Sequence, residues 1–505
     1  MIFSDWLCGF PWKILQGSTD VYVADVCYDS RKAAPDTVFV CMKGSVRDSH
    51  DFIPDILSAG CRVLVVEDGW SIPEAFPADV TVVSTPNGRQ ALAYLAAARF
   101  GHPAEKMITI GVTGTKGKTT TTHMIRAILE TCGKKVGMIG TNGVTIADET
   151  YPTRNTTPES YELQQYFAKM VEKGCEYMVM EVSSQGVKMH RIDGIFFQYA
   201  VFTNISPDHI GPNEHADFDE YLHCKAELFS RCRIGIFNLD DAHSREMMQG
   251  ARCKSYTFSL KQDADFQAGT ISYLHEPGFV GLEFPVTVKT DTRKTLSLRV
   301  GIPGKFNAYN ALAAYSVCSF FDLDDEKIQE ALCQVRVNGR MEIVHSCHKY
   351  SVLVDYAHNA VSMESLLETL RDYHPKRLVC VFGCGGNRAK DRRYSMGEIG
   401  GRMADLCIVT ADNSRFEKVE DIIEDIKVGL HRTNGNYIVV PDRREAIFYS
   451  IRQAEPGDMI AVIGKGHEDY QEIEGVRYPF LDRAVILEAV KGMKNDGKHD
   501  GEKDC

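Results

Sequence analysis

Short apolar runs alternate with amphipathic stretches along most of the chain. Runs such as Met107–Val112, Tyr177–Val182 and Arg377–Phe382 have the length and composition of buried β-strands. Tyr161–Lys173 and Ser362–Tyr373 have apolar positions at helical spacing. Strands that alternate with helices are typical of mostly parallel sheets with helices on both faces. The pattern therefore predicts an α/β protein.

The alternation is interrupted at two places, which predicts three folded domains. A helix over Arg89–Phe100 ends at Gly101-His102-Pro103, and the alternation restarts near Gly339. The predicted domains are residues 1–103, 104–338 and 339–492, and a polar tail at 493–505 is expected to be disordered. Residues 254–300 are β-rich and predict a small antiparallel insert. A length of 505 residues agrees with about three domains.

Composition and charge exclude several classes of protein. Apolar residues make up 44% and charged residues 25%, which excludes a fibrous or mainly disordered chain. Acidic residues outnumber basic ones by 69 to 57, so no chain-wide basic surface for nucleic acid is expected. The N-terminal segment lacks the basic region of a secretory signal, and no run of about 18 apolar residues occurs, so we expect a cytoplasmic protein without a membrane span. We also expect a monomer. The 16 cysteines form no CxxC pair, which argues against a zinc ribbon and favours free thiols.

A glycine-rich segment lies between a predicted strand and a predicted helix, which is the setting of a phosphate-binding loop. Its glycines allow backbone N–H groups to converge on phosphate oxygens, and the helix N-terminus favours negative charge. Lys118 would reach the β- and γ-phosphates of ATP, and Thr119 would bind Mg²⁺. Val112 replaces the first glycine of the usual motif, so the match is to a shorter GxxGKT form. The predicted loop comprises Thr113, Gly114, Thr115, Lys116, Gly117, Lys118, Thr119 and Thr120.

Two further predicted strands end in polar residues that suit a bound nucleotide. In an open α/β sheet, ligands bind beyond the carboxyl ends of the strands. Glu181 and His209 follow such strands and are candidate Mg²⁺ ligands, with the glutamate as the better hard-oxygen donor. Asp208-His209 alone would more often be a structural turn, and Lys225 alone would more often be a solvated helix residue. Because the phosphate loop is present, we favour a ligand role for Asp208-His209 over a structural turn. The spacing alone assigns no role to Lys225.

Taken together, these motifs resemble those of the Mur ligase family. The resemblance covers essentially the whole chain in order and spacing. Its segments are TGTKGKTT (Thr113–Thr120), EVSS (Glu181–Ser184), TN (Thr203–Asn204), DH (Asp208–His209), Lys225, GRME (Gly339–Glu342), DYAH (Asp355–His358), GCGG (Gly383–Gly386) and GKGHEDYQ (Gly464–Gln471).

The resemblance implies an architecture and a reaction. An N-terminal domain would hold a uridine nucleotide, a central domain would bind ATP, and a Rossmann-like C-terminal domain would bring an amino acid. ATP would phosphorylate a substrate carboxylate to an acyl phosphate, which an amine then attacks, with Mg²⁺ and Lys118 offsetting the charge at phosphorus. Within the family, the likeness is greatest to the ligases that add a diamino acid to UDP-N-acetylmuramoyl-L-alanyl-D-glutamate in peptidoglycan synthesis.

The resemblance also implies roles for individual residues. Lys118, His209 and Lys225 would be catalytic, and Thr119, Glu181, His209 and a carbamate on Lys225 would hold Mg²⁺. A carbamate forms on a neutral amine, so we expect a lowered pKa for Lys225. Met189 departs from the pattern, since some relatives have Gln there. The remaining implied ligands are Asn307, Arg340, Asp355 and His358 for the nucleotide, and Ser30, Asn155, Thr156, Thr157, Ser183 and Arg191 for the UDP-substrate.

The identity of the amino acid depends on Asp412-Asn413-Ser414-Arg415, after the predicted strand Leu406–Thr410. Family members that add meso-diaminopimelate typically have DNPR here, and the arginine can grip a distal carboxylate that lysine lacks. Arg393, Gly464 and Glu468 also resemble amino-acid-binding positions, with Glu468 as a partner for an ammonium.

The segment Ser206–His215 instead favours L-lysine as the added amino acid, because it resembles the same segment of some lysine-adding ligases. We therefore favour diaminopimelate and leave open L-lysine, a specialised paralogue, and folylpolyglutamate or cyanophycin-type ligases. A non-catalytic nucleotide-binding regulator is the alternative from another class, and it would be expected to lose Lys118, Glu181 or Lys225.

Overall fold

The computed structural model describes residues 1–44, 47–211, 214–289 and 294–496. The described chain forms two compact units. One contains residues 1–267 and 313–324, and the other contains residues 268–312 and the chain from 325 onward. The division into three domains stays a prediction. The predicted tail at 493–505 begins inside helix α14 (Asp482–Asp496), and its last nine residues, 497–505, lie outside the described part of the chain.

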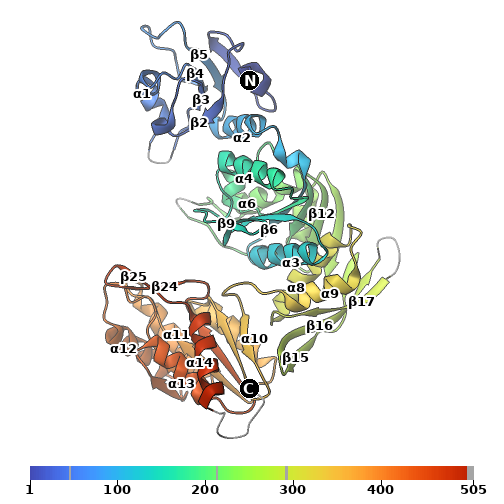
Figure 1. Ribbon diagram of the computed structural model, residues 1–505, viewed down its shortest axis with the longest axis vertical. Helices are drawn as coiled ribbons and strands as arrows, with labels where there is room; N and C mark the ends of the chain where they lie inside the picture. Colours follow the sequence, from blue (N-terminus) through green and yellow to red (C-terminus); the bar gives the residue numbers. More distant parts are fainter. Residues whose placement is uncertain (45–46, 212–213, 290–293, 497–505) are drawn as a thin grey trace. The chain divides into compact units, whose positions relative to one another are not determined.

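The first unit begins with a five-stranded sheet in the order β1-β5-β4-β3-β2. All neighbours are parallel except β1 and β5. Helix α2 (Figure 1) packs on this sheet. Leu92 and Leu95 belong to the buried core there, and Asn87 caps the helix by accepting hydrogen bonds from the N–H groups of Arg89 and Gln90. The elements are β1 (Lys13–Gln16), β2 (Asp25–Cys27), β3 (Thr37–Val40), β4 (Val63–Glu67), β5 (Thr81–Thr85), α1 (Ile53–Ser58) and α2 (Gly88–Arg99).

A second sheet in the same unit has the order β14-β13-β12-β11-β6-β10-β7-β8-β9. The strands from β14 to β7 are parallel, whereas β8 and β9 turn back as antiparallel neighbours. The carboxyl ends of β6, β10 and β11 therefore meet at one edge. The elements are β6 (Ile108–Thr113), β7 (Val136–Gly140), β8 (Gly143–Ile146), β9 (Glu149–Tyr151), β10 (Tyr177–Glu181), β11 (Phe197–Phe202), β12 (Cys232–Asn238), β13 (Lys254–Ser259), β14 (Phe266–Ala268), α3 (Lys118–Thr131), α4 (Ser160–Glu172), α5 (Ser184–Lys188), α6 (Phe218–Ala226) and α7 (Ser244–Gln249).

The second unit contains a six-stranded sheet in the order β18-β19-β23-β20-β21-β22, parallel except for β18. Helices α13 and α14 lie beside this sheet (Figure 1), and their Ile447 and Ile486 are buried in its core. A separate hairpin, β24–β25, follows β23. The elements are β15 (Ser272–Glu276), β16 (Phe279–Val288), β17 (Lys294–Val300), β18 (Glu342–Ser346), β19 (Tyr350–Asp355), β20 (Arg377–Phe382), β21 (Leu406–Val409), β22 (Tyr437–Val439), β23 (Asp458–Ile463), β24 (Tyr470–Ile473), β25 (Val476–Pro479), α9 (Asp325–Gln334), α10 (Ala360–Arg371), α11 (Lys390–Met403), α12 (Val419–Leu430), α13 (Arg443–Arg452) and α14.

The predicted antiparallel insert is present in part. Strands β15, β16 and β17 are antiparallel neighbours, whereas β13, at the start of the predicted region, extends the parallel sheet of the first unit. Helix α8 (Lys305–Cys318) follows the insert. Among the described helices, none combines the length and apolar character that crossing a membrane requires.

Candidate functional site

The predicted phosphate loop joins β6 to α3 and is held in shape by the end of β11. Thr203 Oγ1 donates to the Lys116 carbonyl (2.7 Å), and the Asn204 side chain both donates to that carbonyl (2.9 Å) and accepts from the Lys116 N–H (3.0 Å). A Cβ on Gly114 would overlap Thr203 Oγ1, and Gly117 has a φ of 87° as the N-cap of α3. The two glycines are therefore required by a close approach and by a left-handed backbone.

Lys118 and Lys225 meet at this loop. Lys118 Nζ donates to the carbonyls of Gly114 (2.7 Å) and Thr115 (3.0 Å). Lys225 Nζ is buried and donates to the same Gly114 carbonyl (2.9 Å), over the ring of Tyr221. Burial, together with the positive charge of Lys118, holds the pKa of Lys225 well below its usual range. Desolvation also lowers the pKa of Lys118. The neutral amine that a carbamate requires is thus favoured at Lys225.

Glu181, at the end of β10, faces the first turn of α3. Its carboxylate is buried and accepts hydrogen bonds from Thr119 Oγ1 (2.9 Å), the Thr141 N–H (2.8 Å) and Thr141 Oγ1 (3.3 Å). A Cβ on Gly140 would overlap Glu181 Oε1, so glycine is needed there. Sequence reasoning missed Thr141, although it follows directly on β7, the strand beside β10. The carboxylate of Glu181 and the hydroxyls of Thr119 and Thr141 thus gather beside the phosphate loop.

These oxygens fit a hard cation. Mg²⁺ is usually bound by one or two protein carboxylates together with substrate phosphates and water. Within the described residues, no group of three or more His, Cys, Asp or Glu side chains is placed to hold a metal by itself. Glu181 and Thr119 would therefore act together with the phosphates of a nucleotide.

His209 does not join Glu181. Strand β6 lies between β10 and β11, so the two predicted ligands do not follow neighbouring strands. The imidazole is more than half exposed, and its Nδ1 lies 2.9 Å from Glu214 Oε1. Glu181 and His209 are candidate Mg²⁺ ligands on the idea that they follow neighbouring strands, and this idea is wrong. Ligation of Mg²⁺ by His209 stays a prediction.

Four of the predicted UDP-substrate ligands form one cluster around Thr157. The hydroxyl of Thr157 donates to the Glu181 carbonyl (2.9 Å) and accepts from the N–H (3.0 Å) and hydroxyl (3.1 Å) of Ser183. Arg191 Nη1 donates to the Thr157 carbonyl (3.1 Å). Thr156 Oγ1 lies 3.0 Å from Thr141 Oγ1 and so connects this cluster to Glu181.

Two other predicted UDP-substrate ligands lie outside this cluster. Asn155 is exposed beside it. Ser30 lies in a short 3-10 helix between β2 and β3, which Asp29 caps by accepting a hydrogen bond from the Arg31 N–H.

The predicted nucleotide ligands Arg340, Asp355 and His358 gather around Tyr356 in the second unit. Asp355 accepts from the N–H groups of Met341 and Ala357 (both 2.8 Å), and desolvation raises its pKa. The guanidinium of Arg340 lies 5.3 Å from the centre of the Tyr356 ring, and His358 Nδ1 lies 2.9 Å from the Tyr356 carbonyl.

Asn307, the fourth predicted nucleotide ligand of this unit, is buried at the start of α8. Its amide donates to the Pro303 carbonyl (2.6 Å) and accepts from Asn310 (2.9 Å). These bonds show how Asn307 braces the helix start and leave its nucleotide role a prediction.

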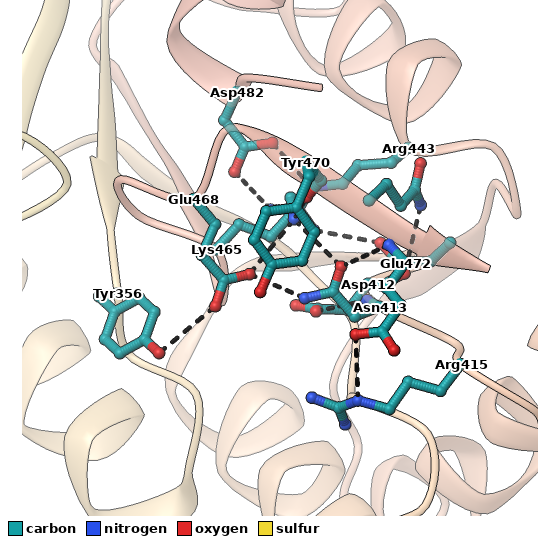
Figure 2. Close-up of polar contacts among 12 residues, drawn as sticks. Tyr356, Asp412, Asn413, Arg415, Arg443, Lys465, Glu468, Tyr470, Glu472 and Asp482 are labelled. Carbon is teal, nitrogen blue, oxygen red and sulfur yellow. Dashed lines mark hydrogen bonds and ion pairs between the residues drawn. The ribbon is translucent and has the colours of Figure 1, made fainter. Parts of the chain in front are cut away.

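The predicted amino-acid ligands Asn413 and Glu468 are linked through Lys465, as Figure 2 shows. Asn413 Nδ2 donates to Glu468 Oε2 (2.7 Å), and the Lys465 ammonium donates to Asn413 Oδ1 (3.3 Å), Glu468 Oε2 (3.4 Å) and the Tyr470 carbonyl. Tyr356 OH donates to Glu468 Oε1 (3.4 Å). Lys465 is fully buried, and sequence reasoning missed it although it lies inside the GKGHEDYQ segment.

The segment from Asp412 to Arg415 lies beside this group. A Cβ on Gly464 would come within 2.5 Å of Asp412 Oδ2, so the two predicted positions pack directly on each other. Ser414 is buried, and its carbonyl packs against Gly386. Arg415 has a φ of 51°, and its Nη1 donates to the Gly386 carbonyl (2.7 Å).

Arg393 is placed differently from the other predicted amino-acid ligands. Its side chain is buried, and its terminal nitrogens donate to Glu417 (2.8 and 2.9 Å) and Asp425 (2.9 Å). Two carboxylates of the protein therefore already satisfy the charge that was expected to bind a ligand. The arrangement makes Arg393 an anchor for the chain that follows Arg415, and its role as a ligand stays a prediction.

A buried ion pair that the sequence did not reveal supports the same region. Arg443 donates to both oxygens of Asp482 (2.8 and 2.7 Å), and both side chains are fully buried. Arg443 also donates to the carbonyls of Ala411 (3.2 Å) and Ile463 (3.0 Å), which precede Asp412 and Gly464. The pair therefore fixes the two strand ends that carry the amino-acid site.

The chain is similar to known proteins both in its individual domains and over nearly its full length. Residues 112–318 match the Mur ligase middle domain, and residues 339–466 match the Mur ligase glutamate ligase domain. A UDP-N-acetylmuramoyl-L-alanyl-D-glutamate–2,6-diaminopimelate ligase of Caldanaerobacter subterraneus subsp. tengcongensis is 39% identical over 475 residues, covering 94% of this chain and 96% of the relative. The chain belongs to the Mur ligase family.

Other similarities extend over the full Mur ligase chain. A protein of the same name from Geobacillus thermodenitrificans is 38% identical and covers 96% of this chain and 98% of its own. The solved structure of a UDP-N-acetylmuramoyl-L-alanyl-D-glutamate–2,6-diaminopimelate ligase has a TM-score of 0.78 at 26% identity, covering 98% of this chain and 99% of that one. A MurF ligase of Thermotoga maritima solved with ADP has a TM-score of 0.53 at 18% identity and shares the fold.

Proposed function

We propose that this Mur ligase adds meso-diaminopimelate to UDP-N-acetylmuramoyl-L-alanyl-D-glutamate in the cytoplasm, as a monomer, with ATP and Mg²⁺. The observation that carries the proposal is the convergence of Lys118, Lys225 and the Glu181–Thr119 pair on one phosphate loop. The hydroxyl of Thr157, at the centre of the Thr157 cluster, donates a hydrogen bond to the backbone carbonyl of Glu181. A carboxylate substrate held by that cluster would lie next to the γ-phosphate that must be transferred to it.

The chemistry follows from the charges at this site. An ionised carboxylate and an ammonium do not condense unaided, so the carboxylate must first gain a leaving group. Its oxygen attacks the γ-phosphorus of ATP, ADP leaves, and the incoming amine then expels phosphate from the acyl phosphate. Negative charge accumulates around phosphorus during transfer, and Lys118 is placed to offset it.

Glu181 and Thr119 would hold Mg²⁺, which would supply positive charge to neutralise the nucleotide phosphates. The lysine carbamate proposed at Lys225 would add an anion beside the loop. Formation of that carbamate is supported by the burial of Lys225 and by its lowered pKa. The relatives that are named as ligases and the neighbour solved with ADP support the use of ATP.

The choice of diaminopimelate over L-lysine rests on Arg415. Its guanidinium is partly exposed at the rim of the amino-acid site, where it can pair with a distal carboxylate. L-lysine has no such carboxylate. The relatives named as 2,6-diaminopimelate ligases support the same choice.

Phosphate release from ATP by the purified protein tests the proposal. We expect release only when UDP-N-acetylmuramoyl-L-alanyl-D-glutamate, meso-diaminopimelate and Mg²⁺ are all present, and much slower release when L-lysine replaces diaminopimelate. Equal turnover with both amino acids would overturn the argument from Arg415. No turnover with either amino acid would overturn the proposed function.

A further inference from the structure

Asp193 is a buried carboxylate that takes no part in the proposed chemistry and joins the two sheets of the first unit. Its Oδ1 accepts from Arg231 Nη1 (2.6 Å), just before β12, and its Oδ2 accepts from Gln90 Nε2 (3.0 Å) of α2. His190 Nδ1 lies 3.1 Å from the same Oδ2. Burial by itself would raise the pKa of Asp193, but the hydrogen bond with His190 and the charge of Arg231 hold this pKa below its usual range. The group that joins the two sheets is therefore a charged one.

His190 extends this connection to the start of α2. Asn87 Oδ1 accepts from the N–H groups that begin the helix, so the amide nitrogen of Asn87 is the donor to His190 Nε2 (3.0 Å). His190 Nε2 then accepts, and the ring proton lies on Nδ1, where it is donated to Asp193. We call Asp193, His190, Gln90 and Asn87 the Asp193 link. Each of its polar groups facing the others has a partner, so the link is a specific joint between the sheets.

The Asp193 link lies between two of the predicted UDP-substrate sites. Arg191 follows His190 directly and donates to the Thr157 carbonyl. On the five-stranded sheet, Ser30 follows β2 and Asn87 follows β5, and these parallel strands end at the same edge. The link therefore ties the segment of Arg191 to the sheet edge that carries Ser30.

A second contact between the two sheets lies near the same sites. The hydroxyl of Tyr28, just after β2, donates to Glu162 Oε1 of α4 (2.5 Å). This contact does not involve the Asp193 link. Loss of the link should therefore loosen the spacing between the sheets without separating them.

We propose that Asp193 is a positioning residue that holds the uridine site near Ser30 at a fixed spacing from the Arg191–Thr157 site, so that one UDP-substrate can occupy both. This inference rests on the proposed function. A ligand with two halves binds more tightly when its two sites are held at the distance that it spans, because the second half then binds at a high effective concentration. Asp193 would raise the affinity for the whole substrate without touching it.

The whole substrate is compared with its two halves. The kcat and KM are measured for UDP-N-acetylmuramoyl-L-alanyl-D-glutamate. The inhibition constants are measured for UDP-N-acetylglucosamine, which lacks the lactyl-dipeptide, and for 1-phospho-N-acetylmuramoyl-L-alanyl-D-glutamate, which lacks the uridine. The proteins are the wild type, Asp193→Ala, Gln90→Met, and Asp79→Ala as a matched control. Asp79 is an exposed carboxylate just before β5 that pairs with Arg62 (2.9 Å).

We expect Asp193→Ala to raise the KM for the whole substrate about 10-fold, which corresponds to the loss of one charged hydrogen bond. The kcat and both inhibition constants should change by less than about 2-fold, because each half binds to one side of the joint. Arg231 keeps Glu227 as a partner (3.0 Å) in this variant, and thermal unfolding checks its fold. Gln90→Met retains the buried charge pair and should raise the KM about 3-fold, so it tests the same link if Asp193→Ala does not fold. Asp79→Ala should behave as the wild type.

The possible failures differ from one another. Inhibition constants for the halves that rise as much as the KM for the whole would mean that Asp193 only supports the individual sites, and this would overturn the inference. An unchanged KM in both Asp193→Ala and Gln90→Met would also overturn it, while leaving the proposed function intact. A wild type that does not turn over the UDP-substrate would overturn the proposed function and the inference with it.

Discussion

Glu181→Gln is the substitution that separates a metal ligand from a structural anchor. The fold places three hydrogen-bond donors around the carboxylate, at 2.9, 2.8 and 3.3 Å. A glutamine keeps an oxygen for the Thr141 N–H, and its NH₂ group can donate to the hydroxyls of Thr119 and Thr141 if they rotate to accept. Each bond loses its charge assistance, about 1 kcal/mol or somewhat more, but the buried negative charge is also removed. We therefore expect the free energy of unfolding to fall by no more than about 2 kcal/mol.

The expected effect on activity is much larger. At 4 Å and an effective dielectric constant of about 20, a carboxylate attracts a divalent cation by about 8 kcal/mol, partly offset by the loss of water from both ions. We expect the Mg²⁺ concentration for half-maximal phosphate release to rise more than about 100-fold, equivalent to about 2.7 kcal/mol. The assay is a Mg²⁺ titration of phosphate release, with thermal unfolding as a check on the fold.

Glu176→Gln is the matched control for this experiment. Glu176 is an exposed carboxylate just before β10, at the opposite end of the strand from Glu181, and its substitution should leave the Mg²⁺ dependence unchanged. If Glu181→Gln also left that dependence unchanged, the carboxylate would only anchor Thr119 and Thr141. The proposed metal site would then have to be abandoned.

Three other predictions follow from contacts in the structure. Gly140→Ala should displace the Glu181 carboxylate and lower kcat/KM by about 10-fold to 100-fold through the loss of one charged hydrogen bond, and unchanged kinetics would contradict the close approach. Asp482→Ala should leave the Arg443 charge buried without its partner and lower the free energy of unfolding in urea by about 3–5 kcal/mol, whereas a change below about 1 kcal/mol would contradict the importance of the pair. Lys225 has a lowered pKa in the fold, so the unfolded chain binds more protons up to the usual value of 10.5, and stability should rise with pH through that window. Lys225→Met should therefore be more stable than the wild type at neutral pH by a margin that shrinks as pH rises, and a constant margin would contradict the pKa shift.

Strands that are buried on both faces could be predicted from the sequence, because continuous apolar runs have few other structures available. The predicted strand at Arg377–Phe382 matches β20, and the run at Met107–Val112 differs from β6 by one residue at each end. The sequence did not predict several short strands, which are β1, β2, β7, β8, β9, β18, β24 and β25. Two glycines interrupt β7, and the β24–β25 hairpin is largely polar and exposed, so neither has a strong period of two.

The parts of the candidate site that could be predicted are those whose functional residues lie close together in the sequence. The loop at Lys118 and the side chain of Glu181 follow from strand, turn and helix signals close together in the sequence. The partners that complete the site come from distant segments. Thr141 reaches Glu181 because β7 pairs with β10, and Glu472 reaches Arg415 because a hairpin folds back on the end of β21. Such pairings depend on sheet order, which residue patterns do not encode.

Oxygen transfer during turnover tests the central claim most directly. UDP-N-acetylmuramoyl-L-alanyl-D-glutamate is labelled with ¹⁸O in both carboxylates of its glutamate and incubated with ATP, Mg²⁺ and meso-diaminopimelate. Activation through an acyl phosphate transfers one carboxylate oxygen to the phosphate that leaves, so mass spectrometry should find one ¹⁸O in each inorganic phosphate released. Product formation with unlabelled phosphate would contradict carboxylate activation at the Lys118 loop.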